Sequence, residues 1–497
     1  MLHIDQTLTI GATERPIART IPMVLLVFVC FALLRLSVFH PTVLVGNDLF
    51  WHLAYGNSIL DHHALPTADW LSWTFKDQPY QITQWLGEVL LALAVRLGGS
   101  ALLSMTLAVA SVLTLYCAWR AAALYIRNPV TALFLALLTV LPVLTLNARP
   151  QIFGMLAFAA LVWALSVWFE RKDPRALVAM PAIMVLWVNL HGSFIVGVLY
   201  IAALGGGAWI VTFLEMKYKF VASVRVHLPL ALASFAAIFA VLINPYGWHA
   251  FEYVIKISHL QSTAPGAIRE WDSTSLTTDH GFSFIAIVLL VFATIALKKE
   301  RPTVQMVLAF LSTVYFGLQA DRQSLLALIA LVPIFGQALM GSWFESEIDR
   351  NLNAVVKLWK AGVIILFVGC GAMLLHSASI RYIEDSFERM YPKKLLDYLD
   401  KNHIEGKLFN SVEHGGYIAS RGRLVFLDGR LDLYGDPFFY GTGLTIRGEA
   451  GWREFLAKYK PDLFILDNKN VLIELLMKSD KCQSLYSDQY HSALKCV

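Results

Sequence analysis

Long apolar runs recur along this chain and constrain its fold more than any other feature of the sequence. The runs lie at residues 20–40, 100–122, 129–146, 150–168, 176–190, 194–213, 226–243, 282–297, 302–319, 324–341 and 359–378. A helix of about 20 apolar residues crosses a hydrocarbon core of about 30 Å, where every backbone polar group needs an internal hydrogen bond. We therefore predict an α-helical polytopic membrane protein with about eleven transmembrane helices.

The composition supports this class and excludes others. Of the 497 residues, 57% are hydrophobic and 15% are charged, whereas roughly 25% are charged in an average soluble domain. The net charge of +4 is too small to indicate a nucleic-acid partner. The five cysteines form no CxxC motif and no Cys/His cluster, so they predict neither a metal site nor a redox site.

The loops between the apolar runs alternate in charge, which indicates their side of the membrane. Loops rich in Lys and Arg lie preferentially in the cytoplasm. The basic residues of these loops are, loop by loop, Arg120 and Arg127; Arg171, Lys172 and Arg175; Lys217 and Lys219; Lys298, Lys299 and Arg301; and Lys357 and Lys360. We expect a cytoplasmic N-terminus and an uncleaved anchor at residues 20–40. The alternation requires helix 84–97 to lie in the interface, so residues 41–99 form the first outer loop.

The remaining loops contain few basic residues but several isolated polar groups, and we place them all on the outer face. They are GNDLFWHL at 46–53, NARPQ at 147–151, NLHGS at 189–193, NPYGWHAFEY at 244–253, IREW at 268–271 and ADRQ at 320–323. These loops bring Asp48, Arg149, His191, Glu270 and Arg322 to one membrane surface. Helical bundles build binding sites in this way.

Ordinary structural roles would also explain each of these five residues, and the sequence leaves them open. Asp48 would be the N-cap of an interfacial helix at Leu49–Leu60. Arg149 would contact lipid phosphates, and His191 would be a buried core residue. Glu270 would pair locally with Arg269, and Arg322 would be a membrane anchor or pair with Asp321.

The last part of the chain has short apolar runs and dense charges, which predicts a water-soluble α/β domain at 379–497 after a transmembrane domain at 1–378. An odd number of spans places this domain outside with Asp48. We expect strands at Lys407–Ser411, Leu424–Asp428 and Leu463–Leu466, and helices at Lys393–Asn402, Gly451–Lys460 and Leu472–Met477.

Two stretches of this domain contain residues suited to chemistry, EHGGYI at 413–418 and LDGRLDLYGD at 427–436. A divalent-ion or sugar site is one interpretation of Asp428, Arg430 and Asp432. The second interpretation, which we favour, is an ion-pair network that docks this domain onto the membrane part. We also hypothesise a disulfide between Cys482 and Cys496, because both lie on the outer side.

A series of motifs resembles the GT-C superfamily of membrane glycosyltransferases. The series is GNDLFWHLAYGNSIL, LPTADWLSWTF, QWLGEVLLAL, NARPQ, WVNLHGSF, INPYG and EW, followed by FNS, GGY, DGR and LYG, as in an uncharacterised bacterial branch. It covers nearly the whole chain in order. The resemblance implies an enzyme of the bacterial inner membrane that transfers a sugar or oligosaccharide from a polyprenyl-phosphate or pyrophosphate carrier on the extracytoplasmic side.

The resemblance also implies roles for residues. Asp48 matches the early acidic residue that activates the acceptor, and a carboxylate is suited to removing a hydroxyl proton as the sugar gains oxocarbenium character. Direct attack would invert the anomeric centre. Arg149, His191 and Arg322 are candidates for binding the donor phosphate, whose growing charge needs stabilisation. The remaining candidates for binding substrate are Trp51, His52, Gln84, Glu88, Gln151, Tyr246, Glu270 and Trp271. The tryptophans among them would stack on sugar faces or lie in the aromatic belt of the membrane interface, and we favour the belt.

The chain lacks two motifs found in parts of the superfamily. It has no DxD pair after the first apolar run, so we expect no cofactor, while a divalent metal stays open. It also lacks the WWDYG-type motif of oligosaccharyltransferases, which argues against a peptide acceptor. The acceptor would be a glycan, a lipid or a protein. The alternative function is a non-catalytic or transport component of an envelope polysaccharide or glycolipid assembly system, although a transporter should have more polar residues inside its spans.

Overall fold

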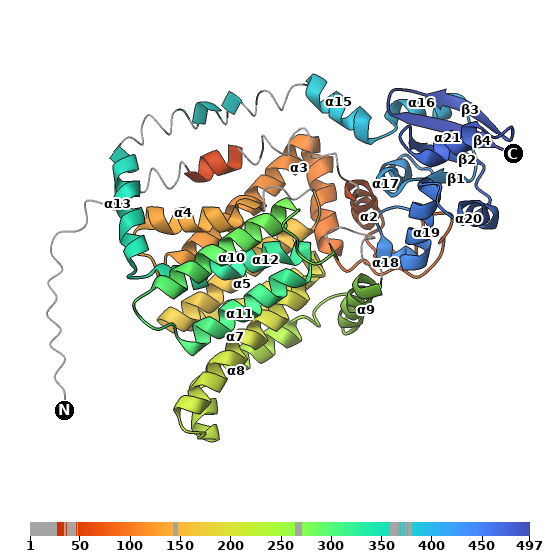
Figure 1. The fold of residues 1–497 in the computed structure, drawn as a ribbon. Coiled ribbons are helices and arrows are strands. Elements are labelled where there is room, and N and C mark those ends of the chain that lie inside the picture. Colours follow the sequence, from red (N-terminus) through yellow and green to blue (C-terminus); the bar gives the residue numbers. More distant parts are fainter. Residues whose placement is uncertain are drawn as a thin grey trace, which may run out of the picture.

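The computed structural model describes residues 27–33, 36, 46, 48–142, 148–263, 271–357 and 380–497, with isolated residues between 365 and 375. A bundle of helices forms one part of the molecule, and a small sheet surrounded by helices forms the other (Figure 1). The spans expected at 20–40 and 359–378 lie largely outside the described residues. The total of eleven spans therefore stays a prediction.

Six helices of the described chain are long and apolar enough to cross a membrane, and three shorter apolar helices accompany them. The long helices are α3 (Trp85–Ala122), α5 (Gln151–Arg171), α7 (Phe194–Glu215), α8 (Phe220–Ala240), α10 (Asp279–Leu297) and α12 (Asp321–Leu339). The shorter ones are α4 (Pro129–Val140), α6 (Pro174–Leu190) and α11 (Val304–Gln319). Each coincides with one of the expected spans, and the chain is an integral membrane protein.

Helix α12 lies at the centre of the bundle. It packs against α10, α11, α4, α5 and α3, and 83% of its most apolar 18-residue segment is buried inside the protein. The corresponding values for α7 and α8 are 22% and 17%. A helix that is apolar on all sides is normally buried in protein or exposed to lipid, and these helices show both cases.

Helix α3 changes direction at Gly98 and Gly99, which have non-helical backbone angles. Gly99 has a φ of 61°, which glycine adopts at little steric cost. The break separates residues 85–97 from the part that follows, at the boundary expected between the interfacial helix and the next span. The first part packs against α2 (Leu49–His62), which is two residues longer than the predicted helix Leu49–Leu60.

Residues 380–497 contain a four-stranded mixed sheet in the order β1-β2-β4-β3. The strands are β1 (Leu408–Asn410), β2 (Leu463–Asp467), β3 (Cys482–Ser487) and β4 (His491–Cys496). Strands β1 and β2 are parallel, and the other pairs are antiparallel. The first and third predicted strands match β1 and β2, whereas β3 and β4 were not predicted. The division of the chain at residue 378 stays a prediction.

The predicted strand at Leu424–Asp428 is wrong. Val425 forms only an isolated bridge, and its partner is Ser72 of the first loop. Val425 N donates to Leu71 O at 3.0 Å, and Trp73 N donates to Val425 O at 3.0 Å. This segment is extended because it pairs with the first loop instead of the sheet.

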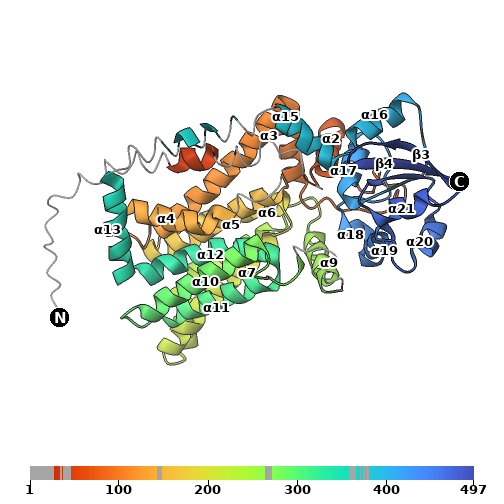
Figure 2. The same cartoon turned by 45° about the horizontal axis from the view of Figure 1, so that its top comes forward.

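The helices of this region pack around the sheet and toward α2. They are α15 (Ile380–Met390), α16 (Lys393–Lys401), α17 (Val412–Ser420), α18 (Leu431–Tyr434), α19 (Asp436–Ile446), α20 (Trp452–Tyr459) and α21 (Val471–Met477). Helices α16, α20 and α21 match the predicted ones. Helix α17 packs against α2, and the two lie side by side in both views (Figure 2). Two further helices, α9 (His249–Thr263) and α13 (Trp343–Lys357), precede this region in the chain, and α9 lies beside α18 in both views (Figures 1 and 2).

Cys482 and Cys496 form a disulfide between β3 and β4. The two residues are directly opposite each other in the register of this strand pair. The hypothesis of a disulfide at these positions is confirmed.

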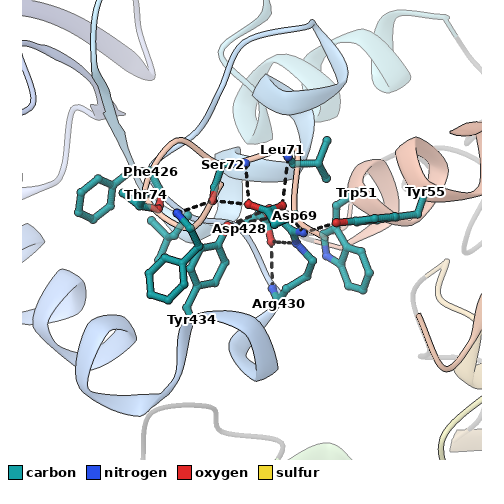
Figure 3. Close-up of polar contacts among 12 residues, drawn as sticks. Trp51, Tyr55, Asp69, Leu71, Ser72, Thr74, Phe426, Asp428, Arg430 and Tyr434 are labelled. Carbon is teal, nitrogen blue, oxygen red and sulfur yellow. Dashed lines mark hydrogen bonds and ion pairs between the residues drawn. The ribbon is translucent and has the colours of Figure 1, made fainter. Parts of the chain in front are cut away.

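Arg430 docks the C-terminal region onto the first loop (Figure 3). Its guanidinium donates to both oxygens of Asp428, at 2.7 and 2.6 Å, and to Asp69 Oδ1 at 2.7 Å. It also donates to the hydroxyl of Tyr55 on α2 at 2.5 Å. The side chains of Arg430, Asp69 and Asp428 are fully buried. Of the two interpretations of LDGRLDLYGD, this geometry matches the ion-pair network.

We predict that Arg430→Met destabilises the chain by about 3–5 kcal/mol, because it leaves two buried carboxylates without their cation. The measurement is the Tm of the detergent-purified protein. Arg453→Met is the matched control, since Arg453 is exposed and an exposed substitution usually changes stability by less than about 0.5 kcal/mol. Equal Tm values for Arg430→Met and wild type would contradict the prediction.

Candidate active site

Asp48 precedes the first residue of α2 and contacts a cation from another part of the bundle. It occupies the N-cap position, but its side chain makes no capping hydrogen bond. Asp48 Oδ2 lies 2.8 Å from Arg149 Nε, and Asp48 Oδ1 accepts a hydrogen bond from Trp51 Nε1 at 3.1 Å. The side chains of Asp48 and Arg149 are 17% and 23% exposed. The carboxylate is therefore directed at an arginine, and the simple capping role is not what the structure shows.

The C-terminal region covers the segment that carries Asp48. The hydroxyl of Tyr391 accepts from Gly46 N at 2.8 Å and donates to Gly46 O at 2.9 Å. Gly429 lies so close to Asp48 that a Cβ atom there would overlap Asp48 Oδ1 and approach Trp51 Nε1. Only glycine, which has no Cβ atom, allows the backbone to lie this close to the Asp48 carboxylate. Residues from both ends of the chain thus build the surroundings of this carboxylate.

His191 lies just beyond the end of α6 and interacts with Arg149 and with a second arginine, Arg322. Ser193 N donates to His191 Nδ1 at 3.1 Å, so the proton of the neutral ring is on Nε2. Burial lowers the pKa of His191 to about 3, and the charges of Arg322 and Arg149 contribute to this shift. Arg322 Cζ lies 4.9 Å from the ring centroid of Trp271. Loops from four segments therefore meet at this end of the bundle.

His52 and Glu88 form a buried polar pair next to these cations. His52 Nδ1 lies 3.1 Å from Glu88 Oε1 and 3.4 Å from Gln84 Nε2, and both members of the pair are buried. Burial, followed by the charge of Arg149, lowers the pKa of His52 well below its usual value. His52 is therefore a neutral side chain in the folded protein near pH 7.

The structure brings together most of the predicted site residues. Contacts or charge interactions connect Asp48, Trp51, His52, Gln84, Glu88, Arg149, His191, Arg322 and Trp271. Tyr246 interacts electrostatically with Glu88, and its hydroxyl accepts from Ile82 N at 2.9 Å. Gln151 begins α5, two positions after Arg149. Glu270, with its predicted partner Arg269, lies outside the described residues.

Sequence reasoning missed Gly429 and Tyr391 as neighbours of the Asp48 segment. Tyr391 is 345 positions away from Gly46, and no local pattern links the two. Asp321, considered above as a local partner of Arg322, accepts a hydrogen bond from Thr278 Oγ1 at 2.6 Å.

One group within the described part of the chain has ligand atoms placed to hold a metal ion, His414, Asp467 and His491. These residues lie on α17, β2 and β4. None of them was predicted as a site residue, because they are scattered over the sequence. His414 belongs to the stretch EHGGYI, but nothing in the local sequence assigns a role to this histidine.

Comparisons with known proteins identify the fold. No protein-family match and no match to a curated protein are found. Among solved structures, the chain is similar to apo ArnT from Cupriavidus metallidurans at 13% identity and a TM-score of 0.56, covering 97% of this chain and 98% of ArnT. The same ArnT bound to undecaprenyl phosphate matches at 14% identity and a TM-score of 0.52, covering 96% and 98%.

The oligosaccharyltransferase AglB from Archaeoglobus fulgidus, in complex with an inhibitory peptide and a dolichol-phosphate, is also similar. It matches at 13% identity and a TM-score of 0.52, covering 90% of this chain and 69% of AglB. At these identities the similarity shows the fold alone. The chain has the fold of the GT-C membrane glycosyltransferases, and the predicted resemblance is confirmed for the fold.

We predict that acidification destabilises the wild type more than His52→Asn. The folded chain keeps His52 neutral, whereas the unfolded chain takes up a proton below about pH 6.5. The stability that depends on neutral His52 is therefore present above that pH and lost as the pH falls. The measurement is the difference in Tm between about pH 7.5 and about pH 5. The exposed residue His63 provides the control His63→Asn, and equal pH responses of His52→Asn and wild type would refute the prediction.

Proposed function

We propose that this chain is an inverting glycosyltransferase that moves a sugar from a polyprenyl-phosphate-linked donor to an acceptor on the extracytoplasmic side of the membrane. One observation carries the proposal: in a chain with the GT-C fold, Asp48 contacts Arg149 at the bundle end that also holds His191 and Arg322. The carriers bound to ArnT and AglB, undecaprenyl phosphate and dolichol-phosphate, support a polyprenyl donor here.

Asp48 acts as the general base. Its carboxylate takes the proton of the acceptor hydroxyl while the oxygen attacks the anomeric carbon from the face opposite the lipid phosphate. The bond to the phosphate breaks in the same displacement, so the anomeric centre is inverted. The leaving phosphate needs no proton.

Arg149 changes partner during the reaction. In the structure it is paired with Asp48 at 2.8 Å, which satisfies both charges in a partly buried place. A lipid phosphate competes with Asp48 for this guanidinium, because arginine binds phosphate oxygens through charge-assisted hydrogen bonds. Donor binding then leaves the Asp48 carboxylate available to the acceptor. Arg322 and the Nε2–H of His191 add to the stabilisation of the leaving group.

The disulfide supports the extracytoplasmic side. Disulfides persist in oxidising compartments outside the cytoplasm, and Cys482–Cys496 belongs to the same region as Tyr391, which contacts the Asp48 segment. Carboxylate and disulfide are therefore on one side of the membrane in our proposal. The acceptor is a glycan, lipid or protein.

We predict that Asp48→Asn lowers transfer by about 10²–10⁴-fold, the usual contribution of a general base, while the Tm changes little. The measurement is release of polyprenyl phosphate, by mass spectrometry, from a panel of polyprenyl-phosphate sugars. Asp61→Asn is the matched control, since Asp61 lies on the same helix, is 57% exposed and pairs with Arg96. Undiminished release by purified Asp48→Asn would overturn the base assignment.

We predict that Gly429→Ala lowers transfer by up to about 100-fold, because the new methyl group displaces the Asp48 carboxylate and small misplacements are costly in catalysis. The same release assay measures the effect. Gly443→Ala is the control, since a Cβ there meets only the flexible end of Arg447. Wild-type turnover by a folded Gly429→Ala would show that the contact has no influence on the reaction.

A further inference from the structure

Three residues that can bind a metal meet at one edge of the C-terminal sheet. Asp467 is the last residue of β2 and His491 is the first residue of β4, and the two are opposite each other in the strand register. His414 lies in the first turn of α17, which begins directly after β1. Because β1 and β2 are parallel, α17 starts at the edge where β2 ends.

The distances between the ligand atoms suit a single ion. His414 Nε2 and His491 Nε2 each lie 3.4 Å from the same oxygen, Asp467 Oδ1. One ligand atom from each residue lies within 4.8 Å of the other two. In a tetrahedral zinc site with bonds of about 2.0–2.2 Å, neighbouring ligand atoms are about 3.3–3.6 Å apart. The arrangement has room for an ion at the centre of the three residues.

The two histidines lack the hydrogen bonds that buried imidazoles normally make. Both are 1% exposed. Nδ1 of His414 and both ring nitrogens of His491 have no hydrogen-bond partner in the described part of the chain. Buried polar groups without a partner are rare in native proteins and need an explanation. Hydrogen bonds to Asp467 alone would give a partner to only one nitrogen of each ring. The two contacts from Nε2 to Asp467 Oδ1 measure 3.4 Å, which exceeds the usual hydrogen-bond length.

A second carboxylate, that of Asp488, lies near the Nδ1 atom of His491. Asp488 Oδ1 accepts from the backbone N of Tyr490 and of His491, both at 2.8 Å, and lies 3.9 Å from His491 Nδ1. Histidines that bind a metal through one nitrogen usually direct the second nitrogen toward a carboxylate. Asp467 is the solvent-facing member, with 36% of its side chain exposed, so an ion and a water molecule have access.

We propose that His414, Asp467 and His491 bind a divalent transition-metal ion, zinc by the ligand set, with water as the fourth ligand. Two imidazoles and one carboxylate suit zinc, whereas magnesium and calcium prefer oxygen ligands. The ion joins α17 to β2 and β4, and α17 packs against α2. The site is therefore a link within the C-terminal region and does not depend on the proposed transfer reaction.

The test uses full-length, tag-free protein purified in detergent, stripped with a chelator and re-equilibrated with zinc chloride. We expect about one zinc ion per chain by elemental mass spectrometry after gel filtration, the number for a single mononuclear site. Zinc affinity, from competition with a chromophoric chelator, should fall at least about 100-fold in His491→Ala and in Asp467→Asn. Cobalt substitution should give the absorption of a tetrahedral ion in wild type but not in His491→Ala or Asp467→Asn.

Two further measurements separate binding from folding. Asp467→Asn keeps the shape of a partly exposed side chain, and its Tm without metal shows whether it is folded. Zinc should raise the Tm of wild type but not of Asp467→Asn, because a ligand stabilises only a chain that binds it. His403→Asn, which replaces an exposed histidine of the same region, should bind zinc like wild type. Wild type without stoichiometric zinc, or folded Asp467→Asn and His491→Ala with wild-type affinity, would overturn the proposal.

Discussion

The buried guanidinium of Arg430 holds three parts of the chain in place. It lies between Asp69 of the first loop and Asp428 of the C-terminal region, and it also binds the hydroxyl of Tyr55 on α2. A buried charge is tolerated only while its partners remain in position, so these three segments are fixed relative to one another. Gly429 is the neighbour of Arg430 in sequence, and its approach to Asp48 depends on the same arrangement.

The two parts of the molecule contribute different properties to the candidate site. The ends of the bundle helices supply the charges of Arg149 and Arg322 and the neutral ring of His191. The C-terminal region restricts the position of the Asp48 carboxylate. The hydroxyl of Tyr391 holds Gly46 through two hydrogen bonds, and the backbone of Gly429 packs closely against Asp48 Oδ1. A charged group becomes useful in catalysis when its position is restricted, and here the restriction comes from the far end of the chain.

The bundle helices and the charged side chains at their ends were predictable, since span length and loop charge depend only on local sequence. That is why the sequence could group Asp48, Arg149 and His191, which the structure brings together. The strand at Leu424–Asp428 was predicted wrongly because Val425 pairs with Ser72, a partner remote in sequence. Tyr391, Gly429 and the His414 cluster were missed for the same reason: their contacts result from packing of segments that no periodicity connects.

The separation of Tyr391 from Gly46 also sets the order in which the molecule matures. A chain is synthesised from its N-terminus, and contacts between residues so distant in sequence form late. The turn before Asp48 and the bundle helices that follow are made first, while the hydroxyl that fixes this turn is added 345 positions later. A partly synthesised chain thus contains Asp48 and Arg149 but not yet Tyr391 or Gly429. The geometry of the candidate site is complete only when the last part of the chain has folded onto α2.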